Sequence, residues 1–521
     1  MKHSFAPSMP WLHTWAGLVV GWVLFVIFLS GTLACFDKEL DYWMRPALHH
    51  LPAGPTSMDA ATRTLRAMAP HAETLYLRPP SARDPSIHGF AFEPDQPYID
   101  VAFNPRDGQR IPDTVGGTFF FTLHYNLQAG TIGMYLVGLA GMLMLMALIS
   151  GVIIHRRIFK DIFVFRPKIG GQRAWLDGHN LTGVLGLPFH LMMAYTGVAI
   201  MVAIYMFAGV QIGYRGDTLK FYEEMLGTPH PVEQHRPPSQ LAALGPVVAD
   251  AERRLGNEGI EYVQVEHVHD ASVTLYVLAA GRDQIAGGHR TLIYNGITGA
   301  FTGETAGPAP SYRVYQFLSG LHRVQFGGTA FRWMYFLLGT AGCVMLASGM
   351  QVWINKRNKA VAAAGLRSGY GLVRALNVGV VAGMPLASIG LLWINRLLPD
   401  ALADRTSWEA RGFCLVWLLA ALWAWLRLRQ GKPWRDLLAG TATLLVLLPV
   451  LDLITRPTSS LLASLRDGDR VLTTIDLSAL VLGVAFAWLA QRCGRAQPPA
   501  SKTARATGQR HGGARAEALP P

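Results

Sequence analysis

The sequence predicts a polytopic α-helical membrane protein with a duplicated four-helix core, two small extracytoplasmic α+β modules and about four extra C-terminal transmembrane helices. Three observations lead to this fold class. Of the 521 residues, 51% are hydrophobic and only 15% are charged, whereas about a quarter of the residues in soluble domains are charged. Eight long apolar segments occur along the chain, and the first four form a tandem repeat.

The composition also disfavours several function classes. The net charge is +12, but the basic residues lie beside apolar segments, which indicates a membrane rather than a nucleic-acid partner. The four cysteines have no zinc-finger, thioredoxin or C-x-x-C-H spacing, so neither a disulfide framework nor a covalent c-type haem is expected. They are Cys35, Cys343, Cys414 and Cys493.

Eight segments are candidate transmembrane helices, because a bilayer core about 30 Å thick needs about 20 apolar residues of helix. The first segment is too long and too aromatic for a signal peptide, and no small-residue cleavage site follows it, so we expect a retained anchor. The last four segments are shorter or interrupted by Pro and Gly. The segments are Trp11–Phe36, Thr131–His155, Leu181–Gly209, Phe331–Ile354, Leu372–Leu397, Phe413–Leu428, Leu437–Leu453 and Ile475–Leu489.

Short basic loops predict the orientation of these helices. The stretches His155–Arg173 and Lys356–Arg374 are rich in Lys and Arg and nearly free of acids, which places them in the cytoplasm by the positive-inside rule. We therefore expect a multi-pass protein of the bacterial inner (cytoplasmic) membrane, with both termini cytoplasmic and with two long polar segments in the periplasm.

Those two polar segments, Asp37–Phe119 and roughly Val210–Ala330, each read as a small α+β module. Neither shows a nucleophile–base pair, a metal cluster or a phosphate loop, so the catalytic residues remain unknown. The expected helices are Thr56–Met68 and Gln240–Leu255. The expected strands are Thr74–Leu77, Tyr98–Phe103, Tyr262–Val268, Val273–Val277 and Thr291–Tyr294, with turns at Asp107-Gly108 and Asn295-Gly296.

The resulting domain organisation alternates membrane and polar parts. It comprises a first transmembrane helix (1–36), a first module (37–122), helices two and three with a basic cytoplasmic loop (123–209), a second module (210–320), helix four (321–358), C-terminal helices five to eight (370–490) and a disordered basic cytoplasmic tail (491–521).

The first four apolar segments repeat pairwise, and the repeat retains histidines. The first segment opens with His13-x3-Gly17 and continues to Ser30-Gly31, and the third matches it at every offset. The second and fourth segments match in the same way from a Leu-His pair onward. The core is therefore a parallel tandem duplication, and it pairs His13 with His179 and His124 with His322.

In a parallel repeat, each histidine pair shares one depth in the membrane. His13 and His179 fall near the cytoplasmic face, and His124 and His322 near the periplasmic face. Two imidazoles facing each other across a bundle are what a six-coordinate haem iron needs. Plain structural pairs and a proton relay are the alternatives. Small residues would let helices approach or leave room for a flat macrocycle; they are Gly17, Gly183, Gly31 and Gly197.

Two further histidines have no repeat partner. His155 corresponds to Trp353 and reads as an interfacial residue or a less favoured ligand. His190 corresponds to Leu24 and lies on the same helix face as His179, eleven residues on. It is a candidate relay or alternative ligand, or it bonds the carbonyl group that Pro188 frees by kinking the helix.

These motifs resemble the PepSY-associated transmembrane family, the iron-regulated membrane proteins, over roughly residues 8–358. The family resemblance implies that the two modules are PepSY-like domains and that the core is a di-haem b-type conduit, with some members reducing ferric siderophores. By position, the implied haem ligands are the four paired histidines. The motifs are Leu12-His13-x3-Gly17, Phe36-Asp37-Lys38-Glu39, Leu123-His124, Leu321-His322, Leu187-Pro188-Phe189-His190 and Thr196-Gly197.

The expected function is electron transfer through two haem b groups to a periplasmic ferric complex for iron uptake. No G-x-G-x-x-G motif precedes a helix, so the chain is not expected to bind NAD or FAD itself. The electrons must therefore come from another donor, an unidentified quinol or cytoplasmic reductase. One alternative is an iron or siderophore transporter, although the first four segments hold almost no carboxylates and only Asp452, in the seventh, stands out. The other alternative is a non-enzymatic regulator whose PepSY-like modules bind a periplasmic partner.

Overall fold

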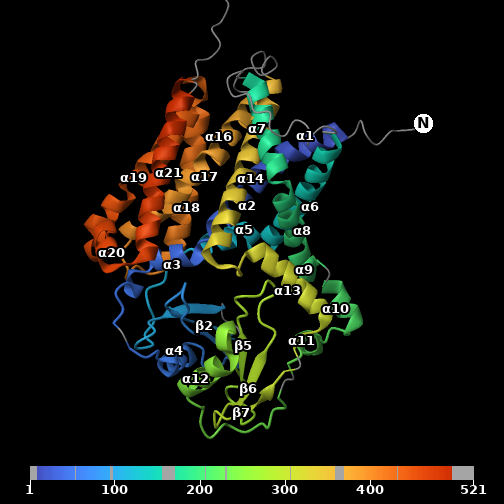
Figure 1. Ribbon diagram of the computed structural model, residues 1–521, viewed down its shortest axis with the longest axis vertical. Helices are drawn as coiled ribbons and strands as arrows, with labels where there is room; N and C mark the ends of the chain where they lie inside the picture. The colour runs from blue at the N-terminus through green and yellow to red at the C-terminus, as the bar shows by residue number, and fades with distance from the viewer. Residues whose placement is uncertain are drawn as a thin grey trace, which may run out of the picture.

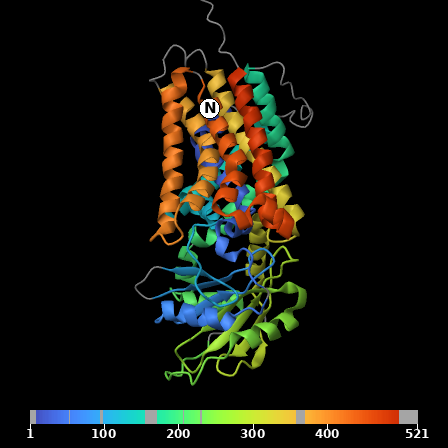
Figure 2. The same ribbon diagram turned by 90° about the vertical axis from the view of Figure 1, so that its left-hand side faces the viewer.

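The computed structural model describes residues 9–52, 54–93, 98–154, 171–205, 207–228, 231–305, 307–357, 369–430 and 432–495. A long helical bundle forms one end of the molecule, and a unit built around a β-sheet forms the other (Figure 1). Turned by 90°, the molecule keeps this two-part outline (Figure 2).

Within the described residues, six helices are long and apolar enough to cross a membrane. Two further helix pairs pass the same test together but are bent, by 60° and 67°. The chain is a multi-pass membrane protein, and each of the eight segments expected from the sequence overlaps one of these helices or bent pairs. The six are α6 (Gly130–Ile154), α14 (Gly328–Lys356), α16 with α17 (Gly369–Leu397), α18 with η4 (Arg405–Gln430), α19 (Pro433–Thr455) and α21 (Arg470–Arg495).

Large apolar side chains on the outside of the bundle face away from the protein. Ile132 on α6 is 72% exposed, and Leu337 on α14 is 63% exposed. An apolar surface of this extent is unfavourable in water but suits contact with lipid.

The duplicated core is visible as two sets of helices with matching contacts. The first set comprises α1 (Met9–Val19), α2 (Gly21–Ala34), α5 (Thr118–Asn126) and α6. The second comprises α7 (Gly171–Leu185), α8 (Leu187–Ile200), α13 (Pro310–Arg323) and α14. Helix α1 packs on α6 as α7 packs on α14, α2 packs on α5 as α8 packs on α13, and α2 packs on α14 as α8 packs on α6.

Both bent pairs break at equivalent places, before Gly21 and before Leu187. The second break precedes Pro188, but the first has no proline. Because the two bends are of similar size, proline is not required for the bend, and a shared glycine-containing hinge region accounts for both better. The backbone N–H of His190 still donates to the Gly186 carbonyl at 2.8 Å across the break.

The C-terminal helices form a second bundle against the core. Helix α16 contacts α2 and α14, α18 and α19 pack against α17, and α21 packs on α19. Residues Ala387 and Leu391 of α17 are fully buried, so this helix lies inside the assembly. The short elements at the sheet-side end are α3 (Asp37–Met44), η1 (Pro46–Leu48), η5 (Pro457–Ser459) and α20 (Leu461–Asp467).

The two polar segments do not form separate modules, which corrects the sequence-based expectation. Their strands share one seven-stranded antiparallel sheet in the described residues, in the order β3-β2-β1-β4-β5-β6-β7. Strands β1 and β4, one from each repeat, pair at its centre, with Leu75 opposite Val265. Separate modules would each have left an edge strand with unpaired backbone groups, and this pairing satisfies them.

The strand and helix positions agree with the expected ones to within a few residues, and β2 and β7 are additional. One face of the sheet is covered by α4 (Met58–Met68) and α12 (Leu244–Leu255), which bury Leu75, Leu77 and Val263. The strands are β1 (Thr74–Arg78), β2 (Ile87–Ala91), β3 (Ile99–Phe103), β4 (Ile260–Glu266), β5 (Thr274–Ala279), β6 (Thr291–Asn295) and β7 (Phe301–Glu304); α9 (Val202–Tyr205), α10 (Phe207–Gly213), α11 (Thr218–Leu226) and η3 (Gly256–Glu258) complete the unit.

Charged side chains join the sheet to the bundle. Arg83, in the loop between β1 and β2, binds Glu39 of α3 with 2.6 Å between Nη2 and Oε2. Arg332 of α14 approaches the same carboxylate at 3.6 Å. Within the sheet unit, Nε2 of His88 on β2 lies 3.1 Å from Oδ2 of Asp84. Burial lowers the pKa of His88, but contacts with Asp100 and Asp84 outweigh burial, and the pKa is raised.

This histidine makes the stability of the sheet unit depend on pH. A raised folded-state pKa means that His88 contributes its full stabilisation below the unfolded pKa of about 6.5 and loses it as pH rises through the folded value. We therefore expect His88→Ala to lower the unfolding temperature most near about pH 6 and less near about pH 9. Thermal unfolding in detergent across this range tests it, with the exposed His235→Ala as control. A pH-independent difference would contradict the ion-pair interpretation.

Candidate functional site

The first histidine pair lies at the end of the bundle away from the sheet, where α1 and α7 meet (Figure 1). The ring centroids of His13 and His179 are 6.3 Å apart with an interplanar angle of 74°. One histidine comes from each repeat, and the sequence separates them widely. The structure therefore brings together the pair that the repeat predicts.

The second pair lies at the sheet-side end of the core, where α5 and α13 pack on α2 and α8. The ring centroids of His124 and His322 are 5.8 Å apart, with 36° between the ring planes. Again each repeat supplies one ring. The two pairs thus occupy opposite ends of the same four-helix core (Figure 1).

Each ring is oriented by a hydrogen bond from Nδ1 to a neighbouring helix. The Nδ1 atom of His13 lies 3.0 Å from the Ala147 carbonyl oxygen, and that of His179 lies 2.8 Å from the Met345 carbonyl. A carbonyl oxygen only accepts, so Nδ1 carries the proton and the neutral ring presents its lone pair on Nε2.

The sheet-side pair repeats this arrangement. The Nδ1 atom of His124 lies 2.7 Å from the Ile27 carbonyl. His322 places Nδ1 3.0 Å from Thr196 Oγ1 and also bonds the Met193 carbonyl, which is the repeat counterpart of Ile27. Outer hydrogen bonds of this kind fix the tautomer and the ring direction of metal-binding histidines.

Each imidazole packs closely against a glycine of a neighbouring helix. A Cβ atom at Gly31 would lie 2.6 Å from His124 Nδ1, and one at Gly197 would lie 2.9 Å from His322 Cε1. At the other end, a Cβ atom at Gly151 would lie 3.4 Å from His13 Cε1, and one at Gly349 would lie 3.0 Å from His179 Cε1. The four glycines that contact the imidazoles therefore form two repeat-related pairs.

This donor set fits haem b better than a bare metal ion. Two nitrogens bound to one metal at about 2 Å each place the ring centroids about 6 Å apart, close to the separations of both pairs. Two imidazoles supply the axial ligands of a six-coordinate haem, whose porphyrin supplies the other four. A bare ion needs more protein ligands, and among the described residues no group of three or more His, Cys, Asp or Glu is placed to hold one. The backbone at Gly17, one turn after His13, has open space beside it, since a Cβ atom there would meet nothing within 4 Å.

His190 belongs to neither pair. It is fully buried in α8, and its Nε2 atom lies 3.3 Å from the Leu338 carbonyl of α14. The interpretation that His190 bonds the carbonyl freed by Pro188 is therefore wrong, because that carbonyl belongs to Val184. Its Nδ1 atom has no hydrogen-bond partner among the described residues. A role as relay or alternative ligand stays a prediction, and His155 lies outside the described residues.

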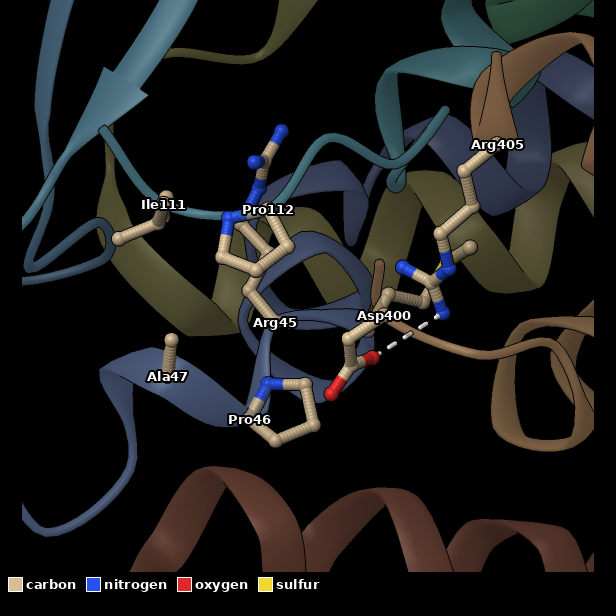
Figure 3. Close-up of a pocket in the computed structure, with 8 residues that line it drawn as sticks. Arg45, Pro46, Ala47, Ile111, Pro112, Asp400 and Arg405 are labelled. Atoms are coloured by element: carbon tan, nitrogen blue, oxygen red, sulfur yellow. Dashed lines mark ion pairs between the residues drawn. The ribbon is translucent and has the colours of Figure 1, made fainter. Parts of the chain in front are cut away.

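A small pocket near the sheet end offers no competing site (Figure 3). Its charged groups are already paired, since Arg405 lies 3.7 Å from Asp400 and Arg45 lies 2.9 Å from Asp41. It is lined by Met44, Arg45, Pro46, Ala47, Ile111, Pro112, Asp400 and Arg405.

The residues that pack against His13 and His179 could not be assigned from the sequence, although the repeat contained a sign of them. The hydroxyl–glycine pairs Ser150-Gly151 and Ser348-Gly349 recur at the same offset in both repeats. Their recurrence indicated a packing role, but not that the glycines seat the histidines.

With this geometry described, the sequence can be compared with known proteins. Residues 10–356, from α1 to the end of α14, match the family described as PepSY-associated TM region. The chain belongs to this family. An uncharacterized protein of Pseudomonas aeruginosa, PA4219, is 27% identical to this chain over 403 residues, which is 75% of this chain and 98% of the relative. The PepSY_TM match covers the whole duplicated core and ends before α16, so the four C-terminal spans lie beyond it.

Proposed function

We propose that this PepSY_TM protein is a b-type haem protein of the bacterial inner membrane that moves electrons to a periplasmic ferric complex, such as a ferric siderophore. The observation that carries the proposal is the assembly of four repeat-related histidines into two imidazole pairs at opposite ends of one core. A transporter or a partner-binding regulator gives no reason for both pairs to have the same Nδ1 anchoring.

The chain's own residues would hold and orient the cofactors. His13 and His179 would hold one haem, and His124 and His322 the other, each through Nε2 while Nδ1 donates to a carbonyl or hydroxyl oxygen. A haem so held supplies reversible one-electron transfer. The helices around each pair are largely apolar, and the polarity of the shell around a metal site tunes its potential.

The sheet unit lies next to the pair formed by His124 and His322, so a ferric complex bound there would receive electrons from the nearer site. Ferric ion is held tightly by hard oxygen donors, and its reduction to ferrous ion weakens that binding and favours release. The electron donor would meet the core at the other end, at His13 and His179, and would be a quinol or a cytoplasmic reductase.

The proposal is tested by the absorption spectrum of the purified full-length protein in detergent, oxidised and then reduced with dithionite. We expect a Soret band with sharp α and β bands and about two haems per chain, since each imidazole pair holds one. A featureless spectrum, even after growth with added haem precursor, would overturn the proposal.

A further inference from the structure

The C-terminal helices, which lie outside the family match, bury three charged side chains together. Arg396 lies on α17, Asp452 on α19 and Asp476 on α21. Both aspartates are fully buried, and Arg396 is 6% exposed. Ionisable residues inside membrane helices are costly and are a default indication of function.

Asp452 is the centre of this cluster. Its Oδ1 atom accepts from Arg396 Nε at 2.6 Å, and its Oδ2 atom accepts from Trp43 Nε1 at 3.0 Å. The Trp43 ring also lies under the guanidinium, 3.6 Å from Arg396 Cζ. Both oxygens of Asp452 are therefore engaged, by Arg396 and by α3, whereas Nη1 and Nη2 of Arg396 have no hydrogen-bond partner among the described residues.

Asp476 has no such partner. Among the described residues, no N–H or O–H group donates to either of its oxygens. Its carboxyl group lies within hydrogen-bonding contact of Asp452. Two carboxyl groups can share a hydrogen bond only when one of them carries a proton, because an ionised carboxylate has no donor.

The charge balance leads to the same conclusion. With both aspartates ionised, the cluster would carry one net negative charge in the bundle interior, which is strongly unfavourable. One bound proton makes the three groups neutral. The surrounding charges do not remove the excess: Arg456, beside Arg396, binds Asp400 at 2.8 Å, and on the α3 side Tyr42 donates to Asp469 at 2.9 Å.

We propose that Asp452 and Asp476 bind one shared, exchangeable proton, which makes the C-terminal helices a proton-binding unit within the membrane. Asp452 lies three residues before the end of α19 and Asp476 six residues after the start of α21, which corresponds to depths of about 5 and 9 Å along the helices. The pair therefore lies near the sheet-side end of the bundle, and an exchanging proton would reach it from that side. The inference is independent of the haem proposal.

Infrared spectroscopy of the full-length protein tests this proposal. At neutral pH we expect a protonated-carboxyl C=O band that shifts in D₂O. The band should disappear in Asp476→Asn and also in Asp452→Asn, because each variant leaves one carboxylate to neutralise Arg396. Asp436→Asn is the matched control, since Asp436 binds Arg427 at a partly exposed position, and its band should equal that of the wild type.

The two variants separate the possible outcomes. Loss of the band in both supports one shared proton, and either variant suffices if the other fails to fold. A band of unchanged intensity in a folded variant would overturn the proposal. A band that persists at half intensity in each variant would also overturn it, because it would mean that each aspartate carries its own proton.

Discussion

Replacing His322 by alanine is expected to lower the haem content from about two to about one per chain. The reason is that the sheet-side pair then keeps only His124, while His13 and His179, at the other end, are untouched. Because electrons must pass both sites in sequence, reduction of an external ferric complex should be lost. The measurements are haem quantification in the purified protein and ferric reduction in reconstituted vesicles.

Two controls define this result. The variant His235→Ala removes an exposed histidine whose side chain is 82% accessible, and it should retain full haem content. The variant His322→Met keeps a ligand of the Met/His type, which should restore binding at a higher reduction potential. Unchanged haem content in His322→Ala would show that this histidine pair does not hold the cofactor.

The variant Gly31→Ala is expected to weaken haem binding at the sheet-side pair by about 10- to 100-fold, the usual effect of disturbing an outer-shell partner. The added Cβ atom would stand 2.6 Å from His124 Nδ1, so the ring must move away from the Ile27 carbonyl that orients it. The helix itself should not suffer, because alanine favours a helix by about 1 kcal/mol over glycine. Haem titration of the apoprotein measures the change.

The matched control for this variant is Gly209→Ala on α10, where a Cβ atom would meet nothing within 4 Å. It should bind haem as the wild type does. If Gly31→Ala also binds normally, the close seat of His124 has no part in positioning the ring. The repeat-related Gly197→Ala should give the same loss through His322, because its Cβ atom would stand 2.9 Å from Cε1.

The sequence predicts the membrane helices and the histidine pairs well, for a physical reason. Apolar length alone identifies a span, and the internal repeat supplies an approximate symmetry that relates His13 to His179 before any contact is known. The same symmetry does not reveal the Nδ1 partners, because Ala147 and Met345 act through backbone carbonyls that carry no side-chain signature.

Pairing between distant elements is where the sequence is insufficient. The joint sheet depends on β1 meeting β4 across almost two hundred residues, and nothing in either strand specifies its partner. Asp476 likewise reads as one polar residue near the start of a span. Its role in binding a proton can be inferred only together with Asp452 and Arg396, which approach it from two other helices.

The contribution of one ring by each repeat to both sites has a consequence for ancestry. Neither half of the core contains a complete imidazole pair, and neither half closes the centre of the sheet. A single unduplicated copy could therefore have formed these features only as a symmetric homodimer, with its two-fold axis passing through both histidine pairs and between the two central strands. Joining two copies in one chain places that interface in its interior and allows the two halves to differ, as they do at Leu24 and His190.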